Sequence, residues 1–180
     1  LLRISPSQWL ALIKLFELSA SARKASQEVH LNYKTTLRAY DILRRILVEE
    51  LARNDEILKG ELEADEAYFG GKRKGNRGRG AGGKTIVYGI LERGGKVSVN
   101  IVQDVSAESL MTETVKRVRR GSIVYTDKWR GYDSLMFCGY KHLNIDHHYK
   151  FKQGKVYING IEGFWSFAKE RLIKHHGISK

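Results

Sequence analysis

LEADEAYF, residues 62–69, is the stretch in which the chain changes from helical to strand-like patterning. Two further strand-like runs follow, TIVYGIL at 85–91 and KVSVNIV at 96–102. The Gly94-Gly95 pair between them is typical of a tight turn, so these two runs predict a hairpin. Three strands are therefore expected at the start of this part of the chain.

The remaining pattern adds helices to these strands. A helix is expected at 106–118, and a short buried strand at 122–126 leads into Asp127. After an irregular stretch, a last helix is expected from Asn159 to about His175. The order of three strands, a helix, a strand, a further segment and a helix is that of an RNase H-like α/β domain, in which helices flank a mixed sheet.

The first 58 residues are patterned as helices. Ser5-Pro6-Ser7-Gln8 predicts a helix start with a capping box. A second helix is expected at 21–29, and Asn32 is the expected N-cap of a longer helix at 33–51. The buried stripe of that helix is predicted to hold Leu37, Tyr40, Leu43, Ile46 and Leu47.

A short helix, a tight turn and a longer helix form the helix-turn-helix plan. In that plan the start of the last helix meets the edges of DNA bases, which here would involve Lys34, Thr36 and Arg38. We therefore expect a small all-α helix-turn-helix region at residues 1–58, followed by a catalytic domain at residues 60–180.

The charge of the chain predicts a polyanionic partner. Its formal net charge is +12, and Lys and Arg side chains that neutralise phosphates release counterions. Residues 70–84, GGKRKGNRGRGAGGK, carry six basic residues, seven glycines and no acid. Such a loop cannot pack a core, so it is expected either to contact DNA or to form a solvated hairpin tip. The candidate DNA contacts are Lys72, Arg73, Lys74, Arg77, Arg79 and, beyond this loop, Arg130.

Cys138 is the only cysteine, which excludes an internal disulfide and a multi-cysteine zinc site and fits a reducing cytoplasm. No run of about 18 apolar residues predicts a membrane span. Because the sequence starts at Leu1 and stops at Lys180 without a helix stop signal, we expect a chain that is truncated at its C-terminus.

Three carboxylates stand where apolar residues would be expected. Asp65 lies within the strand-like run at 62–69, Asp127 ends the strand at 122–126, and Glu162 lies on the last helix. Hard divalent cations bind oxygen ligands of this kind. Between Asp127 and Glu162 lie 34 residues. Lys169 follows Glu162 by two helical turns and so shares its face, where it could hold a phosphate.

Other interpretations of these acids remain open. Asn159 and Glu162 have the spacing of a capping box, which needs no metal. Asn159 is also an alternative third metal ligand. Glu63 and Glu66 are expected to face outward from their strand, although Glu63 shares the face of Asp65 and could lie beside the site.

These motifs together resemble the DDE transposases of bacterial insertion sequences, in particular the fifteen-ninety-five group with its ISXO-two-like catalytic domain. The residues that carry the resemblance are the runs DEAYFGG at 65–71, YTD at 125–127, Gly131-Tyr132 and NGIEGFW at 159–165, with the basic loop between the first two strands and Lys169. The resemblance covers roughly residues 60 to 176. Members of the group often carry an N-terminal zinc ribbon, which one cysteine cannot form, and they continue past the last helix.

The resemblance implies an RNase H-like fold, a triad of Asp65, Asp127 and Glu162, and two bound Mg²⁺ (or Mn²⁺) ions. It also implies recognition of terminal inverted repeats, with hydrolysis followed by strand transfer into target DNA. In part of the group an asparagine takes the place of the third acid, and Asn159 is nearby.

We therefore expect a DNA transposase that acts on double-stranded DNA as a homodimer or larger assembly, in the bacterial cytoplasm with the nucleoid. Two alternatives remain open: a nuclease or resolvase of the same fold, and a non-catalytic DNA-binding remnant of a transposase.

Overall fold

The computed structural model describes residues 2–53, 56–70, 84–127, 138–145 and 157–173. The chain divides into two compact units. One comprises Leu1–Asp55 with Arg171–Ile178, and the other comprises Glu56–Glu170 with the last two residues. Among the described helices, none is both long enough and apolar enough to cross a membrane.

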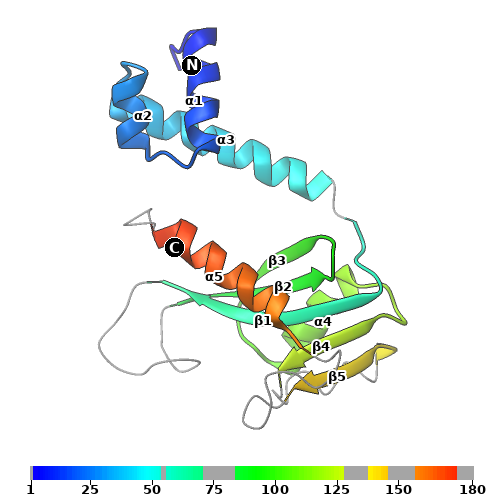
Figure 1. The fold of residues 1–180 in the computed structure, drawn as a ribbon. Helices are drawn as coiled ribbons and strands as arrows, with labels where there is room; N and C mark the ends of the chain where they lie inside the picture. Colours follow the sequence, from blue (N-terminus) through cyan, green and yellow to red (C-terminus); the bar gives the residue numbers. More distant parts are fainter. Residues whose placement is uncertain (1, 54–55, 71–83, 128–137, 146–156, 174–180) are drawn as a thin grey trace. The chain divides into compact units, whose positions relative to one another are not determined.

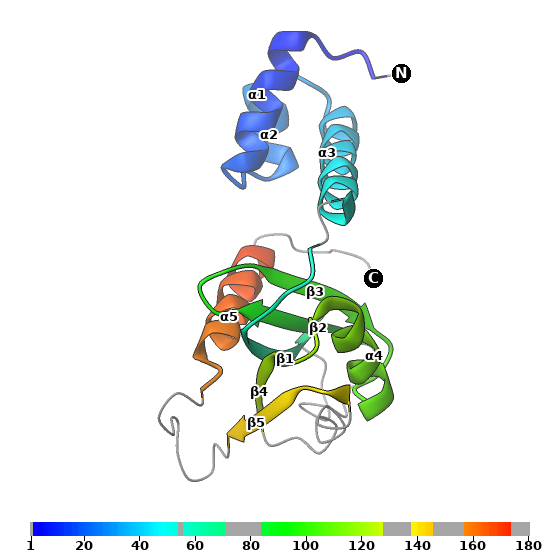
Figure 2. The same ribbon diagram turned by 90° about the vertical axis from the view of Figure 1, so that its right-hand side faces the viewer.

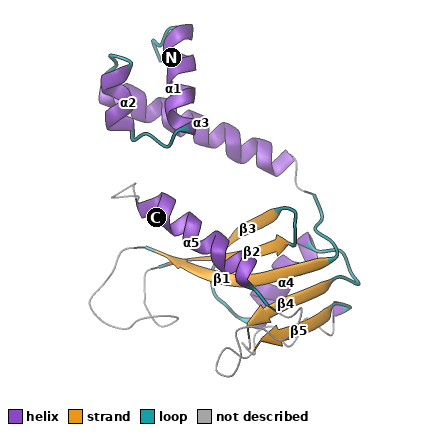
Figure 3. Cartoon of the chain, in the orientation of Figure 1, coloured by secondary structure: helices purple, strands orange, loops and turns teal. Residues whose placement is uncertain are grey.

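The first unit contains three helices, α1 (Pro6–Glu17), α2 (Ala22–Glu28) and α3 (Tyr33–Arg53) (Figure 3). The predicted capping box is confirmed, because the backbone N–H of Gln8 donates to Ser5 Oγ and the backbone N–H of Ser5 donates to Gln8 Oε1. Asn32 caps α3 as predicted, since its Oδ1 accepts from the backbone N–H of Lys34 at 2.8 Å. These caps satisfy backbone donors that have no partner within the helix.

The core of the first unit covers only the first half of α3. Its buried members are Leu12, Ala25, Val29, Ala39 and Tyr40, with Leu43 packed at its edge. The prediction of the buried stripe is right for Tyr40 and wrong for Leu37, Ile46 and Leu47, which are 43–55% exposed. The last apolar residue of α3 that packs with α1 and α2 in this core is Leu43.

The second unit is built on a mixed sheet of five strands, β1 (Glu61–Phe69), β2 (Thr85–Glu92), β3 (Val97–Val102), β4 (Ile123–Asp127) and β5 (Lys141–Ile145). Their order in the sheet is β3-β2-β1-β4-β5. β1, β2 and β3 pair antiparallel, whereas β4 pairs parallel with both β1 and β5. Strand β5 lies in the stretch that the sequence left as irregular.

Two helices cover the two faces of this sheet, α4 (Ala107–Arg117) on one and α5 (Asn159–Ile173) on the other (Figures 1 and 2). β1 is thus a central strand with a helix over each face. Side chains of β1 point alternately to the two faces, so residues on either face can be buried, polar ones included.

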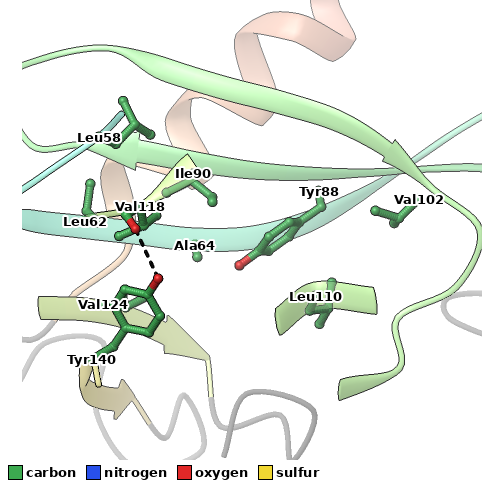
Figure 4. Packing of buried hydrophobic residues seen from close by; sticks show 10 residues of the cluster. All are labelled: Leu58, Leu62, Ala64, Tyr88, Ile90, Val102, Leu110, Val118, Val124 and Tyr140. Atoms are coloured by element: carbon green, nitrogen blue, oxygen red, sulfur yellow. Dashed lines mark hydrogen bonds between the residues drawn. The ribbon is translucent and has the colours of Figure 1, made fainter. Parts of the chain in front are cut away.

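The face under α4 holds an apolar core (Figure 4). Its largest fully buried members are Leu62, Tyr88, Ile90, Leu110 and Val124. The two hydroxyls in this core have partners: Tyr88 Oη lies 2.9 Å from Thr114 Oγ1, and Tyr140 Oη donates to the Val118 carbonyl at 3.0 Å. This core fixes β1, β2 and β4 against α4.

The face under α5 is packed more closely at one point. The Trp165 ring lies over Gly89, where an added Cβ would stand 2.4 Å from Trp165 Cζ2. Gly89 is the partner of Asp65 in the β1–β2 register. The missing side chain of Gly89 therefore lets α5 approach the sheet directly beside Asp65.

Replacement of Gly89 by alanine should destabilise the protein by about 1–3 kcal/mol, because the buried Trp165 ring must shift to make room. The matched change is Gly163→Ala on α5, where nothing lies within 4 Å of the added Cβ. Alanine there should be neutral or stabilising by up to about 1 kcal/mol. Urea denaturation of both variants measures the difference, and equal midpoints would contradict this account of Gly89.

Candidate active site

Asp65 and Asp127 lie at the same level of two adjacent parallel strands. The pairing of β1 with β4 ends with Glu63 opposite Tyr125. Two residues further along each strand are Asp65 and Asp127, and a step of two keeps a side chain on the same face. That face is the one under α5, because Tyr125 packs with Ile161 and Trp165 of that helix.

Glu162 reaches this region from α5. It follows the buried Ile161 and is itself exposed, while Asp65 and Asp127 are partly buried. The three acids therefore come from a central strand, its parallel neighbour and the covering helix.

The charges of these acids act on one another. Burial, together with the negative charges of Glu66, Asp127 and Glu162, raises the pKa of Asp65 to about 7, although a hydrogen bond from the Glu66 backbone acts to lower it. A carboxyl that holds its proton near neutrality marks a place with excess negative charge, which is typical of functional sites.

The donor chemistry of this site fits Mg²⁺ or Mn²⁺, since all three groups are carboxylates and hard cations prefer oxygen. A divalent cation would also balance the negative charge around Asp65. Within the described ranges, however, no three His, Cys, Asp or Glu side chains are already arranged as a metal-binding group. The acids are close enough to interact electrostatically without forming a closed ligand set.

Glu63 and Glu66 are buried, so the expectation that they face outward is wrong. The residue Glu63 is only 1% exposed. Its Oε1 accepts from Arg93 Nε at 2.9 Å, and its Oε2 accepts from the Ile161 backbone N–H at 3.0 Å. Glu66 is buried toward the other face. The reason is that β1 is central and covered on both sides, which strand alternation alone does not reveal.

The capping-box interpretation of Asn159 and Glu162 does not describe this helix. An N-cap residue precedes the first helical residue, whereas α5 begins at Asn159 itself. The carboxylate that accepts from the first turn of α5 at Ile161 is Glu63, from β1. Asn159 is exposed, and its role as a metal ligand stays a prediction.

Lys169 lies two turns after Glu162 on α5, and both side chains are exposed. The buried residues of the helix are Ile161 and Trp165. The shared face expected from the seven-residue spacing is therefore available to solvent and to a ligand.

The predicted DNA contacts on α3 separate into two kinds. Lys34 and Arg38 are exposed. Thr36 is fully buried, and its Oγ1 donates to the Asn32 carbonyl at 3.3 Å. The prediction that its side chain contacts a base is therefore wrong. The side chain points into the small three-helix core instead. Lys72, Arg73, Lys74, Arg77, Arg79 and Arg130 lie outside the described residues.

Arg93, Gly89 and Gly160 do not stand out in the sequence as functional residues. Arg93 next to Gly94 was part of a turn, where an arginine is ordinary. A glycine within the TIVYGIL strand is a recognised signal of close backbone approach, and it was the one available clue to Gly89.

Residues 57–180 match the ISXO2-like transposase domain family. The chain belongs to this family. The match spans the whole sheet and helices α4 and α5, and it includes the three acids.

Named relatives agree with this family. A transposase-like protein of Haemophilus influenzae, described as uncharacterized, is 40% identical over 85 residues, which cover 47% of this chain and 69% of that protein. An uncharacterized protein in the transposable element ISH50 of Halobacterium salinarum is 28% identical over 96% of this chain and 63% of its own length. The chain thus spans about two thirds of these relatives.

A solved structure of the Mos1 transposase paired-end complex with the left transposon end is also similar. It is 13% identical, with a TM-score of 0.37, over 99% of this chain and 72% of that one. This TM-score is too low to establish a common fold.

The protein without metal should lose stability as the pH rises toward neutrality because of Asp65. The folded chain holds the Asp65 proton up to a pKa of about 7, against an ordinary value of 3.8. The Asp65 carboxyl therefore favours folding most at pH values below its ordinary pKa. Its contribution to stability, at most about 4 kcal/mol, is lost as the pH approaches 7.

Thermal unfolding in chelator between about pH 5 and pH 8 measures this loss. Asp65→Asn cannot titrate, so its Tm should fall less over the same range, and added Mg²⁺ should restore part of the parent's Tm at the higher pH. Parallel Tm profiles for parent and variant would contradict the assignment to Asp65.

Proposed function

We propose that this chain is a DDE transposase, which cleaves DNA at the ends of an insertion sequence and joins those ends to target DNA. The observation that carries the proposal is the convergence of Asp65, Asp127 and Glu162 from β1, β4 and α5. The charges of the last two act on Asp65, whose pKa is about 7. The family membership of residues 57–180 supports it.

The sheet fits an RNase H-like catalytic domain. Three antiparallel strands are followed by two parallel ones, with β1 in the centre and a helix on each face. In this arrangement, Asp127 ends β4, and Asp65 lies in the middle of β1, just past the last paired residues of these two parallel strands. The carboxyl end of a parallel strand is a usual place for a site in an α/β sheet.

Phosphoryl transfer requires an activated hydroxyl and stabilisation of the leaving oxygen. Two bound Mg²⁺ or Mn²⁺ ions would supply both. Asp65, Asp127 and Glu162 would hold them, with Asn159 as the alternative third ligand. Lys169, exposed on the face of Glu162, would hold a phosphate of the substrate strand.

DNA binding would involve both units. In the first unit, α2, the turn and α3 have the order of a helix-turn-helix, with Lys34 and Arg38 exposed at the start of α3. Terminal inverted repeats and target DNA are the proposed partners. Two transposon ends must be held together, so we propose a homodimer or larger assembly on DNA, acting with the nucleoid in a bacterial cytoplasm.

Strand transfer from labelled, pre-cut transposon ends in Mg²⁺ tests this function. The parent should give joined product, and Asp127→Asn should lower its yield by at least about a hundredfold, because an amide binds a hard cation poorly. Glu108→Gln is the matched control, an exposed acid on α4 over the opposite face, and it should remain active.

The other outcomes identify the alternatives. Mg²⁺-dependent nicking without joining would replace the proposal with a nuclease or resolvase of the same fold. If parent and Asp127→Asn both bind DNA equally and neither cuts it, the chain is a non-catalytic DNA-binding protein.

Binding to DNA should weaken steeply with salt, with a log–log slope of several units that reflects several phosphate contacts. Arg38→Ala should reduce that slope by about one. Lys14→Ala removes an exposed cation that pairs with Glu17 on α1 and should leave the slope unchanged. Fluorescence anisotropy across a salt series measures both, and equal slopes for the two variants would exclude α3 from the interface.

A further inference from the structure

We propose that Arg93 is the positioning residue of the three-carboxylate site: one guanidinium fixes the two strands and the helix that carry Asp65, Asp127 and Glu162. The inference deepens the proposed function and rests on it, because it concerns how the same site is assembled.

Arg93 lies at the end of the β1–β2 ladder, where its backbone N–H donates to the Glu61 carbonyl. Its side chain is only 15% exposed. Each nitrogen of the guanidinium has an acceptor: Nε donates to Glu63 Oε1 at 2.9 Å, Nη1 to Glu61 Oε2 at 2.8 Å and Nη2 to the Tyr157 carbonyl at 2.6 Å. The planar fork therefore joins β1 to the segment that leads into α5.

Two aromatic rings pack against the same group. The Arg93 Cζ atom lies 3.8 Å from the ring centroid of Tyr125 and 3.9 Å from that of Tyr157. Tyr125 Oη also donates to Glu61 Oε2 at 3.1 Å. Cation–π contacts of this kind are strongest where water is excluded, so β4 is joined to the cluster through Tyr125.

Each acid of the site is close in sequence to a member of this cluster. Glu63 precedes Asp65 by two residues on β1, and Tyr125 precedes Asp127 by two residues on β4. Both pairs share a face of the sheet. Arg93 thus contacts each strand two residues before the acid that the strand carries.

The second carboxylate oxygen of Glu63 links the Arg93 cluster to Glu162. Glu63 Oε2 accepts from the backbone N–H of Ile161, the residue before Glu162. Gly160 makes this contact possible, because a Cβ there would lie 2.8 Å from Glu63 Oε2 and 2.6 Å from Leu91 Cδ2. The start of α5 is therefore held by the carboxylate that Arg93 holds.

A buried ion pair alone says little about stability, because desolvation offsets the attraction. The geometry here distinguishes a positioning role, since three acceptors and two rings need a planar fork. Lysine at this position would keep the charge but lose the fork. Arg93→Lys should therefore affect the carboxylate site more than the fold.

Titration of Mn²⁺ followed by electron paramagnetic resonance tests this without any reaction. Arg93→Lys should bind Mn²⁺ about 10–100-fold more weakly than the parent, the usual effect of losing a residue that orients ligands. Circular dichroism should show a folded chain. The DNA affinity in chelator should stay within about twofold of the parent's, because Arg93 is not among the proposed DNA contacts. Lys96→Gln is the matched control, since Lys96 pairs with Glu56 on the surface beyond the same turn, and its Mn²⁺ affinity should equal the parent's.

A second variant covers a failure of Arg93→Lys to fold. Glu63→Gln keeps an acceptor for the Ile161 N–H but removes the charge that Arg93 pairs with, and it should also weaken Mn²⁺ binding about tenfold or more. Parent-like Mn²⁺ affinity in a folded Arg93→Lys or Glu63→Gln protein would overturn the positioning role and leave the proposed function intact. A parent that binds no Mn²⁺ would overturn both proposals.

Discussion

The buried carboxylate of Glu63 is the constraint on which the second unit depends. A charged group removed from water within a sheet covered on both faces must have its oxygens paired, because an unpaired buried charge is costly. Arg93 pairs with one oxygen and the first turn of α5 with the other. The helix N-terminus is itself favourable for an anion. The hydrogen bond from the Ile161 N–H to Glu63 therefore fixes where α5 begins against β1. It also fixes the position of Glu162, which is the next residue.

The two faces of the sheet differ in their packing and in their role in the structure. Under α4 the packing is mostly apolar, although Glu66 is also buried on this face. The Tyr88 and Tyr140 hydroxyls there are satisfied locally by Thr114 and the Val118 carbonyl. That face holds the strands in register. Under α5 the packing combines an aromatic ring on a bare backbone, Trp165 on Gly89, with the charged cluster around Arg93. Stability from the first face allows the second to keep acids in positions that would otherwise be unfavourable.

The charge distribution sets a condition on any DNA complex. The chain carries +12 overall, which attracts a polyanion from a distance. At the site, however, burial and the negative charges of Glu66, Asp127 and Glu162 raise the pKa of Asp65. A phosphate would be repelled there unless cations stood between it and the carboxylates. A basic chain with an acidic centre would thus suit the proposed metal-dependent enzyme that acts on DNA.

Features that depend on near neighbours could be predicted from the sequence. The caps at Ser5 and Asn32, the three strands before α4, and the spacing of the acids on their elements were all predictable, since they rest on residues within a few positions or on periodicity. Burial, in contrast, depends on how the elements pack: Thr36 and Glu63 are buried, the second half of α3 is exposed, and β5 completes the sheet. The role of Arg93 also depends on tertiary structure, because its side chain donates to the Tyr157 carbonyl, 64 positions later in the sequence. Alternation tells which residues share a face, but only packing tells which face is removed from water.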